Sequence, residues 1–211
     1  MRDDLRFIVL DGVEGCGKST QIGLLAEALR AAGEEPVVTH EPGGTAVGDA
    51  IRALLLSPEY PDLAPLTETF LFCASRAQHV QQVIRPALED GRIVLCDRFD
   101  ASTFAYQGFA GGVGVEVVER LNEQATGGLV ADLTAILDLA PEVGMRRKFG
   151  HAAEETGLGG DRIERHTADF HRRVREGFLE YARRNPDRCA VVDADRSPED
   201  VFADLAGLLE L

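Results

Sequence analysis

Short apolar runs alternate along the chain with longer stretches in which apolar residues recur every three or four positions. We expect the short runs to be strands, because strands that are buried on both faces are almost wholly apolar. Strands that alternate with amphipathic helices are typical of a parallel sheet covered by helices on both sides. The predicted strands are residues 7–10, 36–39, 93–96, 133–139 and 189–192.

The longer stretches predict the helices between these strands. After Ser19, apolar residues keep the spacing of one helix face until Gly33. Near the C-terminus, Ser197 and Pro198 supply a capping hydroxyl and a proline at the first helical position. Further helices are predicted over 66–89, 115–126 and about 162–185. We therefore predict an α/β fold: one domain over residues 1–211, with a five-stranded parallel sheet flanked by helices.

The composition excludes several classes of protein. The 211 residues carry 36 Asp plus Glu against 22 Lys plus Arg, a formal net charge of −14. This acidic balance argues against nucleic acid as a partner, because phosphate backbones are held by clustered Lys and Arg. No apolar run approaches the ~18 residues of a membrane span, so we expect no membrane partner. The four cysteines form no CxxC pair, which argues against a zinc site or a disulfide framework and favours a cytoplasmic location.

The segment after the first predicted strand has the form G-x-x-x-x-G-K-S and leads into a helix. Backbone N–H groups of such a turn surround a phosphate, and the helix N-terminus adds about half a positive charge. Lys18 would reach the β and γ phosphates, and the Ser19 hydroxyl would be a ligand for Mg2+. We therefore predict a purine triphosphate with Mg2+, although hydrolases, switches, motors and kinases share the motif. The predicted nucleotide-binding residues are Gly12, Val13, Glu14, Gly15, Cys16, Gly17, Lys18, Ser19 and Thr20.

Asp97 and Arg98 stand where the third predicted strand ends, and ligands of open α/β sheets bind at such carboxyl ends. A carboxylate there can hold Mg2+ through water, and an arginine can bridge the phosphoryl groups in transfer. The alternative is a surface ion pair. The turn 41–45, which contains Pro42, could bring backbone close to a ligand, with Arg52 following shortly after. Spacing alone favours a plain turn and a solvated arginine.

Two further groups of residues fit a nucleoside pocket. Phe72 and Arg76 lie four residues apart in a predicted helix and so share one face. An aromatic plane beside a guanidinium can hold a base by stacking and edge hydrogen bonds, although an isolated Phe72 would also fit an ordinary core. Ser102, Tyr106 and Gln107 could line the same cleft, although a polar helix face would have the same spacing.

Taken together, these segments resemble the thymidylate kinase family, in its bacterial type with an acidic residue in the phosphate loop. The matching segments run in order along nearly the whole chain: the phosphate loop through Gln21, Glu-Pro-Gly-Gly-Thr at 41–45, Phe-x-x-x-Arg at 72–76, Asp-Arg at 97–98 with Ala-Tyr-Gln at 105–107, and Asp-Arg-Ile-Glu at 161–164. The resemblance implies the P-loop nucleoside monophosphate kinase fold. It also implies transfer of the γ-phosphoryl group of ATP to dTMP, in dTTP synthesis, and a homodimer formed through the 66–89 and 115–126 helices.

The resemblance assigns roles to residues of the acceptor pocket. Phe72 would stack on thymine, and Arg76 would bond its carbonyl edge. Glu14 would accept a hydrogen bond from the deoxyribose 3′-hydroxyl, and Tyr106 would crowd the place of a ribose 2′-hydroxyl. The other substrate-binding residues would be Pro42, Arg52, Arg98, Ser102 and Gln107, of which the two arginines would hold the acceptor phosphate.

The resemblance also implies a lid, at about 146–162, and an adenine site beside Ala194. Related enzymes with an acidic phosphate loop use a lid arginine to reach the transferred phosphate. Residues 149–160 contain no Lys or Arg, and this glycine-rich polar segment fits a functional lid or a disordered loop equally well. The predicted catalytic residues are therefore Lys18, Arg98, Arg147, with Arg146 as its alternative, and Arg162.

Two rival functions remain open from the sequence. One is a kinase for a different pyrimidine monophosphate, which shares every feature of the donor site. The other is a P-loop switch or ATPase that acts on a protein partner, although the chain lacks an Asn-Lys-x-Asp guanine motif. The acceptor nucleotide distinguishes both rivals from a kinase for dTMP.

Overall fold

The computed structural model describes residues 4–150, 161–164 and 166–211. Its centre is a five-stranded sheet in the order β2-β3-β1-β4-β5, and all four neighbouring pairs are parallel. The predicted five-stranded parallel sheet is therefore confirmed, with strand limits within two residues of those expected. The strands are β1 (Phe7–Gly12), β2 (Val37–His40), β3 (Val94–Asp97), β4 (Leu133–Asp138) and β5 (Cys189–Asp193).

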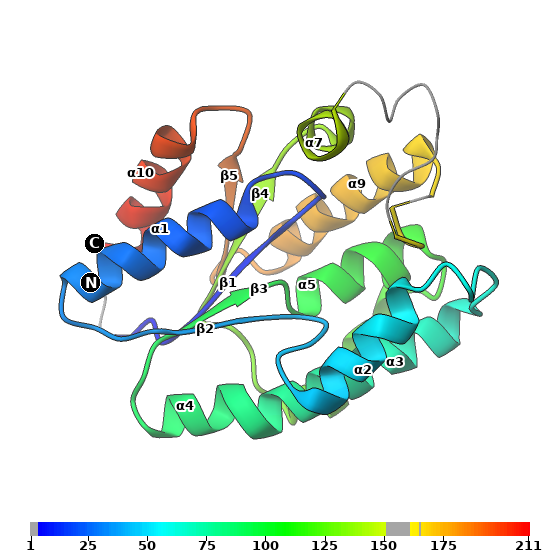
Figure 1. Cartoon of the computed structure of the whole chain (residues 1–211), viewed down its shortest axis with the longest axis horizontal. Helices are drawn as coiled ribbons and strands as arrows, with labels where there is room; N and C mark the ends of the chain where they lie inside the picture. Colours follow the sequence, from blue (N-terminus) through cyan, green and yellow to red (C-terminus); the bar gives the residue numbers. More distant parts are fainter. Residues whose placement is uncertain (1–3, 151–160, 165) are drawn as a thin grey trace.

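Helices cover the sheet on both sides. Figure 1 shows α1 and α10 beside each other on one side and α2, α3 and α4 on the other. The described helices are α1 (Lys18–Ala31), α2 (Ala46–Leu56), α3 (Pro65–His79), α4 (Arg85–Glu89), α5 (Asp100–Thr103), α6 (Val115–Thr126), α7 (Pro141–Phe149), α9 (Ala168–Arg184) and α10 (Pro198–Leu209), with two π-helical segments, η1 (Val80–Ile84) and η2 (Phe104–Ala110).

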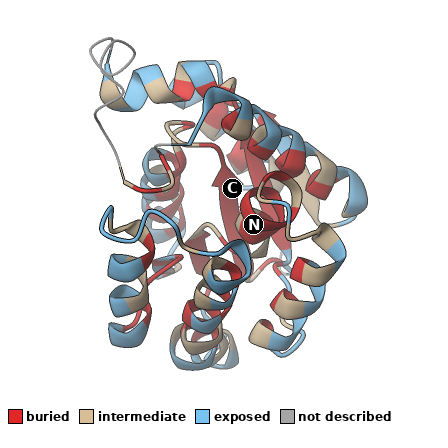
Figure 2. Cartoon of the chain, turned by 90° about the vertical axis from the view of Figure 1, so that its right-hand side faces the viewer, coloured by how far each residue is buried: buried red, intermediate tan, exposed pale blue. Residues whose placement is uncertain are grey.

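Alternate residues of β1 explain why both faces of the sheet are covered. Ile8 and Leu10 belong to a buried apolar cluster that also includes Leu25 of α1. Phe7 and Val9 point into a second cluster, formed with residues of η1 and α4. Side chains of a strand alternate between the two faces, so a strand that is apolar throughout needs a cover on each. The buried strands lie at the centre of Figure 2, and the outer surfaces of the helices are exposed.

The helices differ from the predicted pattern in three ways. The expected helix 66–89 is α3, η1 and α4 in succession, with π-helical turns before Pro86, whose nitrogen has no hydrogen to donate. The helix expected from about 162 begins at Ala168 instead, because the Thr167 hydroxyl accepts from the Phe170 N–H and caps it there. Helices α2, α5 and α7 were not predicted, because each is short or interrupted by polar residues.

The predicted lid lies mostly outside the described residues. Helix α7 ends at Phe149, and the described chain resumes with the turn 161–164. The lid and the single domain both stay predictions. Within the described part of the chain, no helix has the length and apolar character needed to cross a membrane.

Candidate active site

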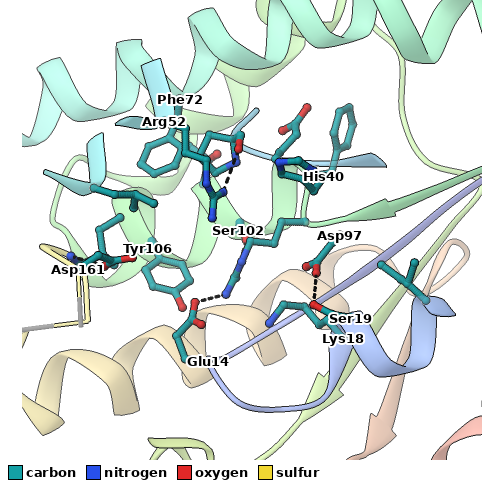
Figure 3. A pocket seen from close by; sticks show the side chains of 18 of the residues that line it. Glu14, Lys18, Ser19, His40, Arg52, Phe72, Asp97, Ser102, Tyr106 and Asp161 are labelled. Carbon is teal, nitrogen blue, oxygen red and sulfur yellow. Dashed lines mark hydrogen bonds and ion pairs between the residues drawn. The ribbon is translucent and has the colours of Figure 1, made fainter. Parts of the chain in front are cut away.

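A cavity of ≈660 Å3 lies at the carboxyl ends of the strands, where ligands of parallel α/β sheets bind. Figure 3 shows Lys18, Ser19 and Asp97 near one end and Arg52, Phe72 and Tyr106 near the other, with Glu14 between them. The structure thus gathers most of the predicted site in one place. The predicted residues that line the cavity are Glu14, Gly15, Gly17, Lys18, Ser19, Pro42, Arg52, Phe72, Arg76, Asp97, Arg98, Ser102, Tyr106 and Gln107.

The phosphate loop joins β1 to α1 and packs closely against α7. A Cβ atom on Gly15 would lie 2.0 Å from the Gly144 carbonyl oxygen, and Gly15 has a φ of +70°, so only glycine fits there. Lys18 is 7% exposed, and its Nζ donates to the carbonyl oxygens of Gly12 at 3.2 Å and Val13 at 2.9 Å. The ammonium group is therefore held inside the loop, at the N-terminus of α1.

Ser19 and Asp97 bring two hard oxygen atoms together beside this loop. The Ser19 hydroxyl donates to Asp97 Oδ2 at 3.0 Å, and this bond links the start of α1 to the end of β3. A hydroxyl and a carboxylate at the edge of an open cavity suit Mg2+, which prefers oxygen ligands and keeps several waters. The donor set of this site therefore fits the predicted metal.

Arg98 is the cation at the centre of the cavity. Its φ of +74° is unusual for a residue with a side chain, and such strain is concentrated at functional sites. Its Nη1 donates to the Gly12 carbonyl at 3.0 Å and to the Ser102 hydroxyl at 3.1 Å, and its Nη2 forms an ion pair with Glu14. Burial alone would raise the pKa of Glu14, but the charges of Arg98, Lys18 and Lys148 lower it well below its usual range.

Asp11 supports two residues of the site from below the cavity lining, and no sequence motif pointed to it. It is fully buried, and its Oδ1 accepts from the Ser102 hydroxyl at 2.7 Å and from the Gly12 N–H at 2.9 Å. Arg98 Nη1 lies 3.5 Å from the same oxygen, although burial raises the pKa of Asp11 despite this cation. An aspartate within an apolar strand, just before the phosphate loop, was the available signal.

The acceptor end of the cavity is formed by side chains from several helices. Arg52 Nη1 donates to the Pro42 carbonyl at 2.9 Å, so the 41–45 turn positions this arginine. Tyr106 is 6% exposed and packs edge-on against Phe178 at 6.0 Å, and Arg98 lies over its ring at 5.6 Å. Burial raises the pKa of Tyr106, so its hydroxyl stays protonated at neutral pH.

Arg76 lies deeper than the rest of the acceptor end, at 2% exposed. It pairs with Glu41, and it also donates to Asn122 Oδ1 and to the Phe99 carbonyl. The sequence indicated that Arg76 shares a helix face with Phe72, and both line the cavity. Spacing gave no sign of the buried partners, because they come from three other parts of the chain.

The predicted lid arginines do not line the cavity. Arg147 donates to the Ala194 carbonyl at 2.9 Å and to Asp195, so it lies beside the predicted adenine site. Arg162 is 8% exposed and donates to the Leu55 carbonyl at 2.9 Å and to Glu68. The structure thus places both outside the cavity lining, and their contact with the transferred phosphate stays a prediction.

Lys148 is a basic residue of this region that does line the cavity, and no sequence motif pointed to it. Its Nζ donates to Glu14 Oε2 at 2.9 Å and also to Glu164. Burial lowers the pKa of Lys148, but the two carboxylates more than offset this and raise it, so the side chain is a cation at neutral pH. Its place one residue after Arg147 was the only available signal.

A phosphate loop, an arginine at the end of β3 and an aromatic pocket on α3, joined in one cavity, define a P-loop nucleoside monophosphate kinase. A family profile described as Thymidylate kinase matches residues 10–205. Thymidylate kinases from Symbiobacterium thermophilum and Desulfovibrio desulfuricans are 48% and 47% identical to the chain, each over 97% of it and over 92% and 94% of their own lengths. The crystal structure of thymidylate kinase from Ehrlichia chaffeensis matches with a TM-score of 0.76 and 32% identity, over 97% of this chain and 98% of that one. The chain belongs to the thymidylate kinase family, so the predicted family and fold are confirmed.

Proposed function

We propose that the chain transfers the γ-phosphoryl group of ATP to dTMP, with ADP and dTDP as products, inside the cavity of Figure 3. One observation carries the proposal: the phosphate loop and an aromatic pocket face the same cavity, with Lys18, Arg52, Arg98 and Lys148 among the residues that line it. Two bound nucleotides repel each other through their phosphates, so a cationic centre is what this reaction requires.

The nucleotides lie end to end in this proposal. ATP places its phosphates in the loop and its adenine toward Ala194 and Arg147. dTMP places its base on Phe72 and its phosphate near Arg52 and Arg98. The Tyr106 ring fills the place beside the sugar where a ribose 2′-hydroxyl would project, which favours deoxynucleotides.

Catalysis consists of alignment and charge neutralisation. The acceptor phosphate has a second pKa near ~6 and is mostly ionised at neutral pH, so it needs no general base. The metaphosphate-like transition state requires little covalent chemistry from the protein. Glu14 is therefore a binding group for the 3′-hydroxyl. Lys18, held on the Gly12 and Val13 carbonyls, is placed to exchange these acceptors for phosphate oxygens.

Mg2+ would be held by Ser19 directly and by Asp97 through water. The metal would supply charge neutralisation between the β and γ phosphates. The Ser19 hydroxyl and Asp97 Oδ2 lie 3.0 Å apart, close enough for one ion and its bound water to contact both residues.

We assign the lid-side cation to Lys148, because it faces the cavity and contacts Glu14 in the phosphate loop. Glu164 holds the same ammonium group and is itself 7% exposed, within the 161–164 turn that Arg162 fixes to α2. Arg162 thus supports the turn from which Glu164 reaches Lys148. Arg147 and Arg162 also remain predicted contacts of the transferred phosphate. Single substitutions of Lys148, Arg147 and Arg162 compare the three by the loss of kcat that each causes.

The test of the function is a panel of nucleoside monophosphates with ATP and Mg2+, measured as ADP formation and as labelled diphosphate product. We expect dTMP to have the highest kcat/KM. A preference for CMP or UMP would show that the enzyme is a kinase for a different pyrimidine monophosphate. Steady hydrolysis of ATP that no monophosphate stimulates would support a P-loop ATPase instead.

A homodimer is the assembly that we propose, formed through α2 and α3 together with α6. Large apolar side chains are exposed on α2 and α3: Leu54 is 37% exposed, Leu66 46% and Phe70 52%. Exposed apolar groups on adjacent helices are a common mark of an interface. Sedimentation of wild type and of Phe70→Glu tests this, with a dimer and a monomer as the expected species.

We propose a cytoplasmic location from the cysteines. Cys16, Cys73 and Cys96 are buried and none of the four cysteines forms a disulfide in the described residues. Free cysteines are typical of proteins in reducing compartments. Fractionation of cells that express the tagged protein would check this.

A further inference from the structure

Beneath the acceptor end of the cavity, four polar side chains form a hydrogen-bonded chain that is almost closed to solvent. Thr39 and Glu41 flank the end of β2, and Arg76 and His79 lie one turn apart on α3. Their exposed fractions are 8%, 4%, 2% and 0% in that order along the chain. Polar groups buried this deeply are costly unless their hydrogen bonds are made, so their geometry is fixed by their partners.

The bonds have a definite direction. Arg76 Nε donates to Glu41 Oε2 at 2.8 Å, and His79 Nδ1 lies 3.0 Å from Glu41 Oε1. A carboxylate only accepts, so we infer that Nδ1 carries the hydrogen and donates it. In the neutral ring Nε2 then accepts from the Thr39 hydroxyl, which lies 2.6 Å away. The chain of bonds thus runs from Thr39 through His79 and Glu41 to Arg76.

The backbone of the 41–45 turn fixes this chain in place. The Glu41 N–H donates to the Asp97 carbonyl at 2.9 Å, so the turn is tied to the end of β3. Gly44 has a φ of +75°, and a Cβ there would lie 2.9 Å from the His79 ring and from the Thr39 hydroxyl. The turn can approach α3 this closely only with glycine at position 44.

Arg76 has donors left over for a ligand. A guanidinium has five N–H groups, and the bonds to Glu41, to Asn122 Oδ1 at 2.5 Å and to the Phe99 carbonyl at 2.8 Å use three of them. Arg76 also lines the cavity. Because arginine donates and never accepts, it can bond the 4-carbonyl group of thymine and offers nothing to the 4-amino group of cytosine. Discrimination between thymine and cytosine therefore depends on where the guanidinium group of Arg76 is held.

We propose that Glu41, His79 and Thr39 are positioning residues for Arg76, and that they set the discrimination between pyrimidines with a 4-carbonyl and a 4-amino group. The proposal rests on the proposed function, in which Arg76 faces the base. Glu41 also neutralises the guanidinium, which would otherwise be an unpaired charge next to the base pocket. His79 holds the carboxylate of Glu41 in the rotation that faces Arg76, and Thr39 holds His79.

The test compares kcat/KM for dTMP and dCMP, at saturating ATP, in wild type, Glu41→Gln, His79→Asn and Thr39→Val. We expect Glu41→Gln to lower the dTMP to dCMP ratio about tenfold, as the loss of one hydrogen bond to a charged group would, with the KM for ATP unchanged. Thr39→Val should lower the ratio less, since it removes only the far end of the chain. Thr134→Val is the matched control: Thr134 is fully buried on β4, and its hydroxyl has no hydrogen-bond partner among the described residues.

A double-mutant cycle separates positioning from simple packing. Arg76→Lys keeps the charge and removes the fork, so it should itself lower the dTMP to dCMP ratio. Adding Glu41→Gln to Arg76→Lys should then change the ratio little further, because Glu41 acts through the guanidinium.

Loss of thermal stability with an unchanged ratio in all three positioning variants would overturn the inference. If Glu41→Gln does not fold, Thr39→Val and His79→Asn decide the outcome, because they leave the ion pair of Arg76 intact. If the wild type prefers dTMP and the variants keep its dTMP to dCMP ratio, the result contradicts this inference and leaves the proposed function standing. A wild type that does not phosphorylate dTMP overturns the proposed function, and this inference with it.

Discussion

The two ends of the cavity are built in opposite ways. The phosphate loop of the donor end is one continuous segment, from β1 into the first turn of α1, and its backbone forms the cradle. The acceptor end assembles Arg52, Phe72 and Tyr106 from three separate parts of the chain, above a buried layer of polar side chains. A backbone cradle can recognise any triphosphate, whereas in our proposal the choice of base depends on how the side chains of the acceptor end are arranged.

This contrast predicts which kinetic constant each end controls. Cations at the donor end and at the centre act on charge that develops during transfer, so their loss should lower kcat. Side chains at the acceptor end hold dTMP before and during transfer, so their loss should raise the KM for dTMP. A substitution at the donor end that raises the KM for dTMP and leaves kcat unchanged would contradict this contrast. So would a substitution at the acceptor end that lowers kcat and leaves the KM for dTMP unchanged.

Lys18→Met should have the largest effect. The transition state loses its loop cation, and removal of one such donor lowers kcat by about 10³-fold. Steady-state kinetics with dTMP measures this, and circular dichroism checks that the loop variant is folded. The control is Arg183→Met, which removes a cation that is 72% exposed on α9, away from the cavity. Loss of activity of similar size in the control would refute the assignment.

Lys148→Met should lower kcat by about 10²-fold, because it removes one donor from a partly solvated position. The KM values for ATP and dTMP should change only a few-fold. Binding of ADP, aluminium fluoride and dTMP together, followed by calorimetry, should weaken in parallel with kcat. If Arg147→Ala or Arg162→Ala lowers kcat more than Lys148→Met does, the lid-side cation is that arginine.

Phe72→Ala should raise the KM for dTMP by about 30-fold, because base stacking on an aromatic side chain contributes roughly 1–3 kcal/mol. The KM for ATP should stay within about two-fold of wild type. Phe72→Tyr keeps the ring and should preserve the KM for dTMP. An equal rise in both Michaelis constants after Phe72→Ala would count against stacking.

Glu14→Gln should have the smallest effect of the four substitutions, because we expect it to leave the pH dependence of activity unchanged. Activity should fall below pH ~6, as the acceptor phosphate takes up a proton. Since the pKa of Glu14 is lowered, the side chain stays ionised there, and the variant should keep the same acid limb. Its contribution to stability is complete above the ordinary pKa of 4.5 and is lost as the pH falls through the lowered value. A shift of the limb in Glu14→Gln, or unfolding that depends on Glu14 near neutral pH, would show that Glu14 titrates there.

The same contrast explains what could be predicted from the sequence. The phosphate loop was predictable because all its groups are adjacent in the chain, and the strands were predictable because burial on both faces makes them apolar. The partners of Arg76 were not, because Glu41 and Asn122 meet it only through tertiary packing. Lys148 was missed for the same reason, since its contact with Glu14 joins residues that lie 134 positions apart in the chain.

A crystal structure of the enzyme with dTMP tests the central claim most directly. We predict the thymine ring on Phe72, its 4-carbonyl oxygen within hydrogen-bond distance of Arg76, and its phosphate between Arg52 and Arg98. Density for the nucleotide outside this cavity, or a base that contacts neither Phe72 nor Arg76, would contradict the account.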